Sequence, residues 1–122
     1  MQIYGQNFKT NIILGTSGYP SPKVLLNCIK ILKTEMVTVS VRRLNNADDN
    51  SFFKLINKSK CTILPNTAGC LSAQEAIVTA EMARELFETD LIKLEVIEDD
   101  LTLKPSMKNT IKATETLIKK GF

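Results

Sequence analysis

The sequence contains no histidine and no tryptophan, and it has only three cysteines among its 122 residues. These cysteines, Cys28, Cys61 and Cys70, are odd in number and lack the spacing of a metal site. The sequence therefore predicts neither a zinc site nor a Cys–His nucleophile, and we expect no metal and no cofactor. Reduced thiols in a reducing compartment fit this pattern best.

Long hydrophobic runs are also absent, and the first residues, MQIYGQNFKT, do not resemble a signal peptide. The net charge is only +3, with no basic run or interleaved aromatic residues that would favour nucleic-acid binding. The 43% hydrophobic and 24% charged residues are typical of a globular protein. We therefore expect a soluble, intracellular domain with neither a membrane nor a nucleic acid as partner.

A strand–helix pattern repeats four times along the chain. Short apolar segments predict strands over residues 11–15, 36–41, 61–64 and 91–97. Helices are expected over about 22–33, 49–56, 72–87 and 106–120. Ser21-Pro22 and the capping box Ser72–Glu75 mark helix starts, and Gly121 marks a helix end. Pro65 is expected to close the third strand.

Strand–helix units of this length indicate an α/β fold with parallel strands and right-handed crossovers. In the second strand Thr38, Ser40 and Arg42 share one face, opposite a row of valines. A polar face opposite an aliphatic face favours a TIM-type barrel over a doubly wound sheet. A complete barrel needs about 250 residues, so residues 1–122 are predicted to be one domain, the first half of such a barrel. The chain would then be a truncated product, a fragment of a longer gene or a half that pairs with another chain.

The fourth predicted strand carries an unusual pair of charges, Lys93 and Glu95. Because side chains alternate along a strand, both point to one face, opposite Ile92, Leu94 and Val96. Burying such charges is costly unless they are paired or used in chemistry. Lys93 is a candidate for a Schiff base with a carbonyl substrate, with Glu95 moving protons. A structural ion pair, or a strand end that reaches solvent, is the alternative.

Three loops carry further candidates. Asn66 and Thr67 follow the third strand and are candidates for substrate binding, although turn formation explains them equally well. The glycine-containing loop 15–20 is a weak candidate for phosphate binding. Arg42 and Arg43 are candidates either for anion binding or for a salt bridge at the rim.

Four blocks of sequence together resemble one enzyme family. They are ILGT with GYPS (13–16 and 18–21), VTV with VRR (37–39 and 41–43), LPNTAGC (64–70) and IKLEVI (92–97). In this order and spacing, from about residue 3 to the last residue, the chain is similar to bacterial and plastid thiazole synthase of thiamine biosynthesis.

The resemblance implies a (β/α)8 barrel that assembles as a homo-oligomer, commonly a tetramer, in the cytoplasm or the plastid stroma. It implies a sulfur-transferring enzyme that builds the thiazole phosphate of thiamine from 1-deoxy-D-xylulose 5-phosphate and dehydroglycine. Sulfur would come from the thiocarboxylate of a ubiquitin-like sulfur carrier protein. Lys93 matches the lysine that forms an imine with the sugar ketone, and Glu95 matches a proposed acid/base.

The chain also departs from that family. The family's phosphate-binding glycine loops and a further catalytic aspartate belong to a second half that these residues do not include. We therefore expect that the chain alone does not turn over to form the thiazole. Two alternatives are another Schiff-base barrel, similar to a class I aldolase, and a non-catalytic half-barrel that serves as an assembly module.

Overall fold

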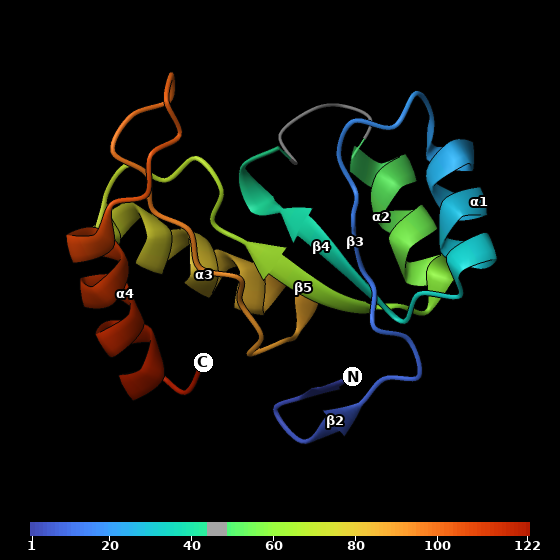
Figure 1. Ribbon diagram of the computed structural model, residues 1–122, viewed down its shortest axis with the longest axis horizontal. Coiled ribbons are helices and arrows are strands. Elements are labelled where there is room, and N and C mark those ends of the chain that lie inside the picture. Colours follow the sequence, from blue (N-terminus) through green and yellow to red (C-terminus); the bar gives the residue numbers. More distant parts are fainter. Residues whose placement is uncertain (44–48) are drawn as a thin grey trace. The chain divides into compact units, whose positions relative to one another are not determined.

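The computed structural model describes residues 1–43 and 49–122, and within them it leaves out the side chains of residues 43, 49–51 and 53 (Figure 1). The predicted anion contact of Arg43 therefore lies outside the described residues. The chain divides into two compact units. The first comprises Met1–Val39 with Asn45–Ile63, and the second comprises Ser40–Leu44 with Leu64–Phe122.

Three of the four predicted strands form one sheet. These strands are β3 (Ile13–Gly15), β4 (Met36–Ser40) and β5 (Thr62–Asn66), arranged in the order β3-β4-β5. β3 pairs with β4 in parallel, with Ile13 opposite Met36. With helices between the strands, this is the α/β arrangement that the strand–helix pattern predicts.

Two strand ends differ from the predictions. β5 continues through Pro65 to Asn66, so Pro65 does not close it. A proline lacks an N–H donor, but the Pro65 carbonyl still accepts a hydrogen bond from the Lys93 N–H at 2.7 Å. β4 ends at Ser40, and Val41–Arg43 form the 3₁₀ turn η1, so Arg42 does not extend the face of Thr38.

An antiparallel hairpin at the N-terminus was not predicted. It pairs β1 (Gln2–Ile3) with β2 (Gln6–Asn7). The turn residues Tyr4 and Gly5 have φ angles of 46° and 77°. Two successive positive φ values are typical of a tight hairpin turn whose twist matches the strands.

All four predicted helices are present. They are α1 (Pro22–Leu32), α2 (Asp49–Ser59), α3 (Ala73–Phe87) and α4 (Met107–Lys119). The Ser72 hydroxyl accepts a hydrogen bond from the Glu75 N–H at 3.1 Å, which confirms the predicted N-cap of α3. Gly121, with φ of 86°, ends α4, and the next N–H, that of Phe122, donates to the Leu117 carbonyl.

The fourth predicted strand, residues 91–97, is not a regular strand. Its residues form two isolated bridges, a parallel one between Asn66 and Lys93 and an antiparallel one between Ile97 and Pro105. The cause lies in the neighbouring segment, because β5 ends at Asn66 and the chain then turns. The Thr67 carbonyl, which would continue the ladder, accepts instead from the Cys70 N–H at 3.1 Å.

The core of the second unit lies between α3, α4 and the segment 91–97. Half of its buried residues are alanines, which let the two helices approach closely. The buried residues are Cys70, Ala73, Ala76, Ile77, Ala80, Val96, Ala113 and Leu117. Ile92 and Leu94 pack against this cluster, so the predicted aliphatic row faces the core.

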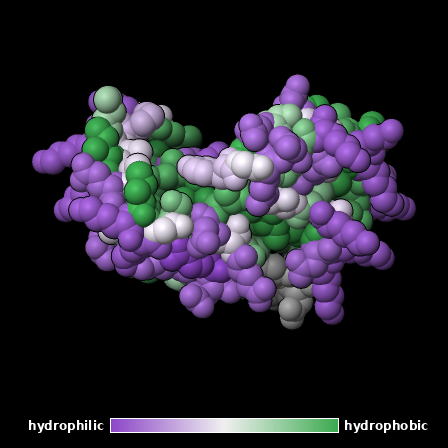
Figure 2. Space-filling model, turned by 90° about the horizontal axis from the view of Figure 1, so that it is seen from below, coloured by the Kyte–Doolittle hydropathy of each residue, from purple (hydrophilic) through white to green (hydrophobic). Residues whose placement is uncertain are grey.

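The surface combines charged residues with exposed apolar ones, as the hydrophobic (green) areas among hydrophilic (purple) ones in Figure 2 show. Along α3, the apolar side chains of Val78, Met82 and Leu86 are exposed. Within residues 1–43 and 49–122, none of the helices has the length and apolar character needed to cross a membrane.

Candidate active site

The Lys93 and Glu95 side chains share one side of the segment, as their spacing predicts, and they form an ion pair, which was the alternative to a catalytic role. The Lys93 Nζ lies 2.6 Å from a Glu95 carboxylate oxygen, and the side chains are 48% and 36% exposed. The next residue, Val96, is buried in the core of the second unit. The two charged side chains thus lie on the accessible side of a segment whose other side is packed.

The backbone of Lys93 is fixed to the end of β5. Its N–H donates to the Pro65 carbonyl at 2.7 Å, and its carbonyl accepts from the Thr67 N–H at 3.3 Å. These two bonds form the parallel bridge that places Lys93 directly beside Asn66. Neighbouring residues of paired segments project to the same face, so the Lys93 and Asn66 side chains leave the backbone side by side.

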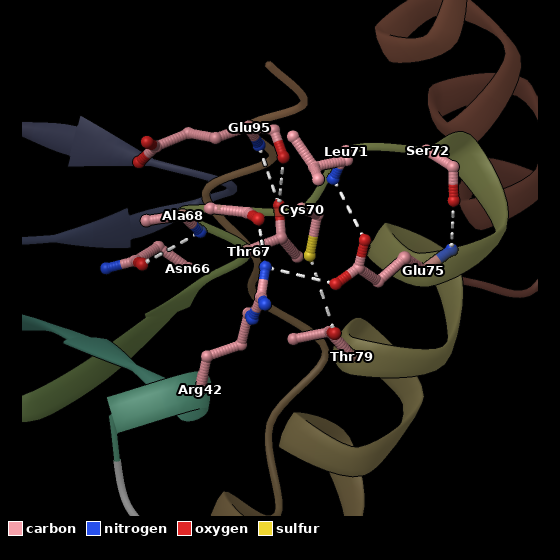
Figure 3. A network of polar contacts seen from close by, with 11 residues as sticks. Arg42, Asn66, Thr67, Ala68, Cys70, Leu71, Ser72, Glu75, Thr79 and Glu95 are labelled. Atoms are coloured by element: carbon pink, nitrogen blue, oxygen red, sulfur yellow. Dashed lines mark hydrogen bonds and ion pairs between the residues drawn. The ribbon is translucent and has the colours of Figure 1, made fainter. Parts of the chain in front are cut away.

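Thr67 is fully buried, and its hydroxyl is engaged with the backbone of Glu95. The hydroxyl oxygen accepts from the Glu95 N–H at 2.8 Å and donates to the Glu95 carbonyl at 2.7 Å. Figure 3 shows both bonds converging on Thr67, while the Glu95 side chain extends away from it. Nothing in the sequence pattern predicted these two hydrogen bonds.

Asn66 is buried, and its side-chain oxygen accepts from the Ala68 N–H at 3.2 Å. This is the turn-forming contact expected of asparagine, which was the alternative to substrate binding. Substrate contacts by Asn66 and Thr67 stay predictions. The other loop candidate, 15–20, belongs to the first unit, where the Thr16 hydroxyl donates to the Thr38 carbonyl at 2.9 Å.

A second polar network closes the loop after Thr67 (Figure 3). The Arg42 guanidinium donates to the Gly69 carbonyl and lies 3.0 Å from a Glu75 carboxylate oxygen, so Arg42 forms the predicted salt bridge. The second Glu75 oxygen accepts from the Leu71 N–H at 2.9 Å. A capping box would have Glu75 accept from the Ser72 N–H, so only the Ser72 half of the predicted box forms as expected. The link from Glu75 to Arg42 was not predicted from the sequence.

Cys70 lies at the centre of this network and is fully buried. Its sulfur lies 3.5 Å from the Thr79 hydroxyl. Burial raises the pKa of the Cys70 thiol above its usual range, and this effect outweighs the opposing hydrogen bond from Thr79. A protonated, buried thiol is a poor nucleophile, so these surroundings do not favour a catalytic role for Cys70.

A cavity of about 390 Å³ opens beside Glu95, and Lys93 is not among the residues that line it. It is lined by charged and apolar residues from three segments, namely Arg42, Ala68, Gly69, Glu95, Ile97, Asp100 and Leu103. The cavity gives a small substrate access to the Glu95 carboxylate. Among the residues that the structure describes, no cluster of three or more cysteines and carboxylates could hold a metal ion.

These observations define an α/β protein in which a lysine–carboxylate pair and a cavity lie where a parallel strand ends. The family model described as "Thiazole biosynthesis protein ThiG" matches residues 2–122. The chain therefore belongs to the ThiG family of thiazole biosynthesis proteins.

Named relatives agree with this assignment. The thiazole synthase of Neisseria meningitidis serogroup C is 46% identical over 125 residues, covering 100% of this chain and 48% of the relative. The Variovorax paradoxus thiazole synthase is 48% identical over 98% of this chain and 46% of its own length. The Burkholderia pseudomallei thiazole synthase is 47% identical over 100% of this chain and 46% of its own length. The chain spans about half the length of these relatives.

Proposed function

We propose that this chain contributes the Schiff-base half of a thiazole synthase, built as the N-terminal half of a TIM-type barrel. The observation that carries the proposal is the Lys93–Glu95 pair, with 2.6 Å between the charged atoms, on the open side of a segment bonded to β5. The C-terminal ends of parallel strands are where barrel enzymes place their catalytic residues. Family membership supports the same role for the pair.

In the proposed chemistry, the Lys93 amine attacks the ketone carbon of 1-deoxy-D-xylulose 5-phosphate. The attacking amine must first lose a proton, and the Glu95 carboxylate is close enough to accept it. The same group then protonates the carbinolamine hydroxyl, which leaves as water as the C=N bond forms. Glu95 therefore returns to its starting state after each imine is made.

The remaining inputs follow from the same proposal. Dehydroglycine and the thiocarboxylate of a ubiquitin-like sulfur carrier protein supply the other atoms of the thiazole ring. Asn66, beside Lys93, is proposed to contact the substrate. Thr67 is buried with its hydroxyl bonded to the Glu95 backbone, so its proposed part is to hold that segment in place. The protein is proposed to act in the cytoplasm or plastid stroma.

A class I aldolase-like reaction is the alternative that shares the lysine. Borohydride reduction in the presence of each substrate separates the two reactions, because it converts an imine into a stable secondary amine. We expect an adduct with 1-deoxy-D-xylulose 5-phosphate and none with a simple aldolase substrate such as dihydroxyacetone phosphate. Equal trapping of both sugars would favour the aldolase-like reaction.

An assembly role is favoured by a separate observation. The exposed side chains of Val78, Met82 and Leu86 follow one another at four-residue spacing along α3, so they lie on one face. We propose that this face packs against a second copy of the chain, as in a homo-oligomer. Size-exclusion chromatography tests this, and a monomer at high concentration would contradict it.

A further inference from the structure

Thr67 occupies the point where the pairing between β5 and the segment 91–97 breaks down. A regular parallel ladder would continue from Lys93 to the next alternate residue, Glu95, whose N–H would bond to the Thr67 carbonyl. In this structure that carbonyl accepts from the Cys70 N–H at 3.1 Å instead. The backbone of Glu95 therefore needs another partner, since unpaired buried backbone groups are costly.

The Thr67 side chain supplies that partner. Its single hydroxyl accepts from the Glu95 N–H at 2.8 Å and donates to the Glu95 carbonyl at 2.7 Å. Both bonds have normal lengths for their donors. Because Thr67 is fully buried, its hydroxyl is shielded from water. One side chain thus replaces two bonds of the ladder.

We infer that Thr67 is a positioning residue, which fixes the Lys93–Glu95 segment so that both charged side chains lie together on its exposed side. The inference rests on the proposed function. The bonds of Lys93 to Pro65 and Thr67 fix one end of the segment, and the Thr67 hydroxyl fixes the other. A shift of one residue would turn Glu95 toward the core and bring Val96 out of it.

Threonine suits this position better than other small residues. Its branched side chain restricts rotation about the Cα–Cβ bond, so the hydroxyl stays aimed at Glu95. Serine keeps the hydroxyl but rotates more freely, whereas valine keeps the shape and loses both hydrogen bonds. The pair of substitutions therefore separates hydrogen bonding from packing.

The first test measures amide hydrogen exchange at Glu95 by NMR, with no substrate present. In Thr67→Val we expect the protection of the Glu95 amide to fall about tenfold or more, and in Thr67→Ser to be largely retained. Thr79→Val is the matched control, because it removes another buried threonine hydroxyl that contacts Cys70 rather than Glu95. Unchanged protection in Thr67→Val, or equal loss in Thr79→Val, overturns the inference.

If Thr67→Val does not fold, NMR of the Thr67 hydroxyl in the unmodified protein tests the inference instead. A buried hydroxyl that makes two hydrogen bonds should give a slowly exchanging proton with a nuclear Overhauser effect to the Glu95 amide. Absence of that signal, in a spectrum that resolves other threonine hydroxyls, overturns the inference as well.

The second test measures the rate of imine trapping at Lys93 against pH. We expect Thr67→Val to slow trapping about tenfold and to change the shape of the pH profile, while Thr67→Ser and Thr79→Val keep both. A loss of folding alone would lower the amount of adduct without changing the profile of the folded fraction. If the unmodified chain traps no imine, the proposed function fails, and the exchange measurement still decides the role of Thr67.

Discussion

The Lys93 amine and the Glu95 carboxylate lie 2.6 Å apart, and both are bonded through their backbones to the residues that end β5. Because the side chains are 48% and 36% exposed, solvent screens the pair. Such a pair contributes little to stability. In the proposed function, the pair places a proton acceptor beside an amine, which is what imine formation requires.

Replacing Glu95 by glutamine tests the proton transfer. We expect Glu95→Gln to slow imine trapping at Lys93 about tenfold or more. The free energy of unfolding should change by less than about 1 kcal/mol, because the ion pair is partly exposed. The measurements are the trapping rate and urea unfolding.

Glu98→Gln is the matched control for that change. Glu98 pairs with Lys104 at 2.9 Å in the same region of the chain, and both side chains are more exposed than Glu95. We expect no change in trapping. An equal loss in both variants would show that the effect is general electrostatics rather than proton transfer by Glu95.

Gly69 is predicted to tolerate no side chain. Its φ of 85° is a conformation that costs L-residues about 1–2 kcal/mol. A Cβ atom at Gly69 would also lie 3.3 Å from the Arg42 Nη1, which is held by Glu75. Gly69→Ala should therefore lower the free energy of unfolding in urea by more than the backbone cost alone.

Gly18→Ala supplies the comparison for Gly69. Gly18 has a φ of 83°, and nothing lies within 4 Å of an added Cβ. The difference between the two variants isolates the contact with Arg42, and we expect it to be about 1 kcal/mol. Equal losses would mean that Arg42 moves aside without cost.

The N-cap of α3 is predicted to stabilise the second unit. Ser72→Ala removes the hydroxyl that accepts from the Glu75 N–H at 3.1 Å, and we expect a loss of about 1 kcal/mol in urea unfolding. Ser106→Ala is the control, because Ser106 precedes α4 without a side-chain capping bond. A larger loss for Ser106→Ala would contradict this assignment of the caps.

The buried thiol of Cys70 predicts a dependence of stability on alkaline pH. Because the pKa of Cys70 is raised in the folded chain, the unfolded chain ionises this thiol first as the pH increases. The contribution of Cys70 to the free energy of unfolding is therefore constant below the ordinary thiol pKa of about 8.5 and falls as the pH rises above it. Urea unfolding between about pH 7 and 10 should show this loss.

Cys70→Ala should weaken that alkaline loss, whereas Cys61→Ala, at a partly exposed cysteine, should leave it in place. Identical pH profiles for the unmodified chain and Cys70→Ala would exclude Cys70 as the cause. Alkylation gives a second readout, since Cys70 should react after Cys28 and Cys61.

The sequence predicted the features that depend on neighbouring residues. Ser72 and Glu75 specify a helix start through bonds spanning three residues, and Gly121 specifies a helix end through its positive φ. The shared face of Lys93 and Glu95 followed from strand alternation, and the packing of Leu94 on the core agrees with it. These signals are local, so a single sequence contains them.

Features that depend on distant segments were missed. The segment 91–97 has the composition of a strand, but its pairing stops where the chain turns after Asn66. The bond of Thr67 to Glu95 spans 28 residues, and threonine at a loop position gives no sign of it. The link between Arg42 and Glu75 is of the same kind, because only the folded chain brings them together.

The most direct test of the central claim is to locate the reduced imine. After incubation with 1-deoxy-D-xylulose 5-phosphate and borohydride, peptide mass spectrometry should find the sugar adduct on Lys93. Lys93→Arg should abolish it, and Lys104→Arg, at another lysine in an ion pair, should retain it. An adduct spread over surface lysines, or one that persists in Lys93→Arg, would contradict the assignment of Lys93 as the Schiff-base residue.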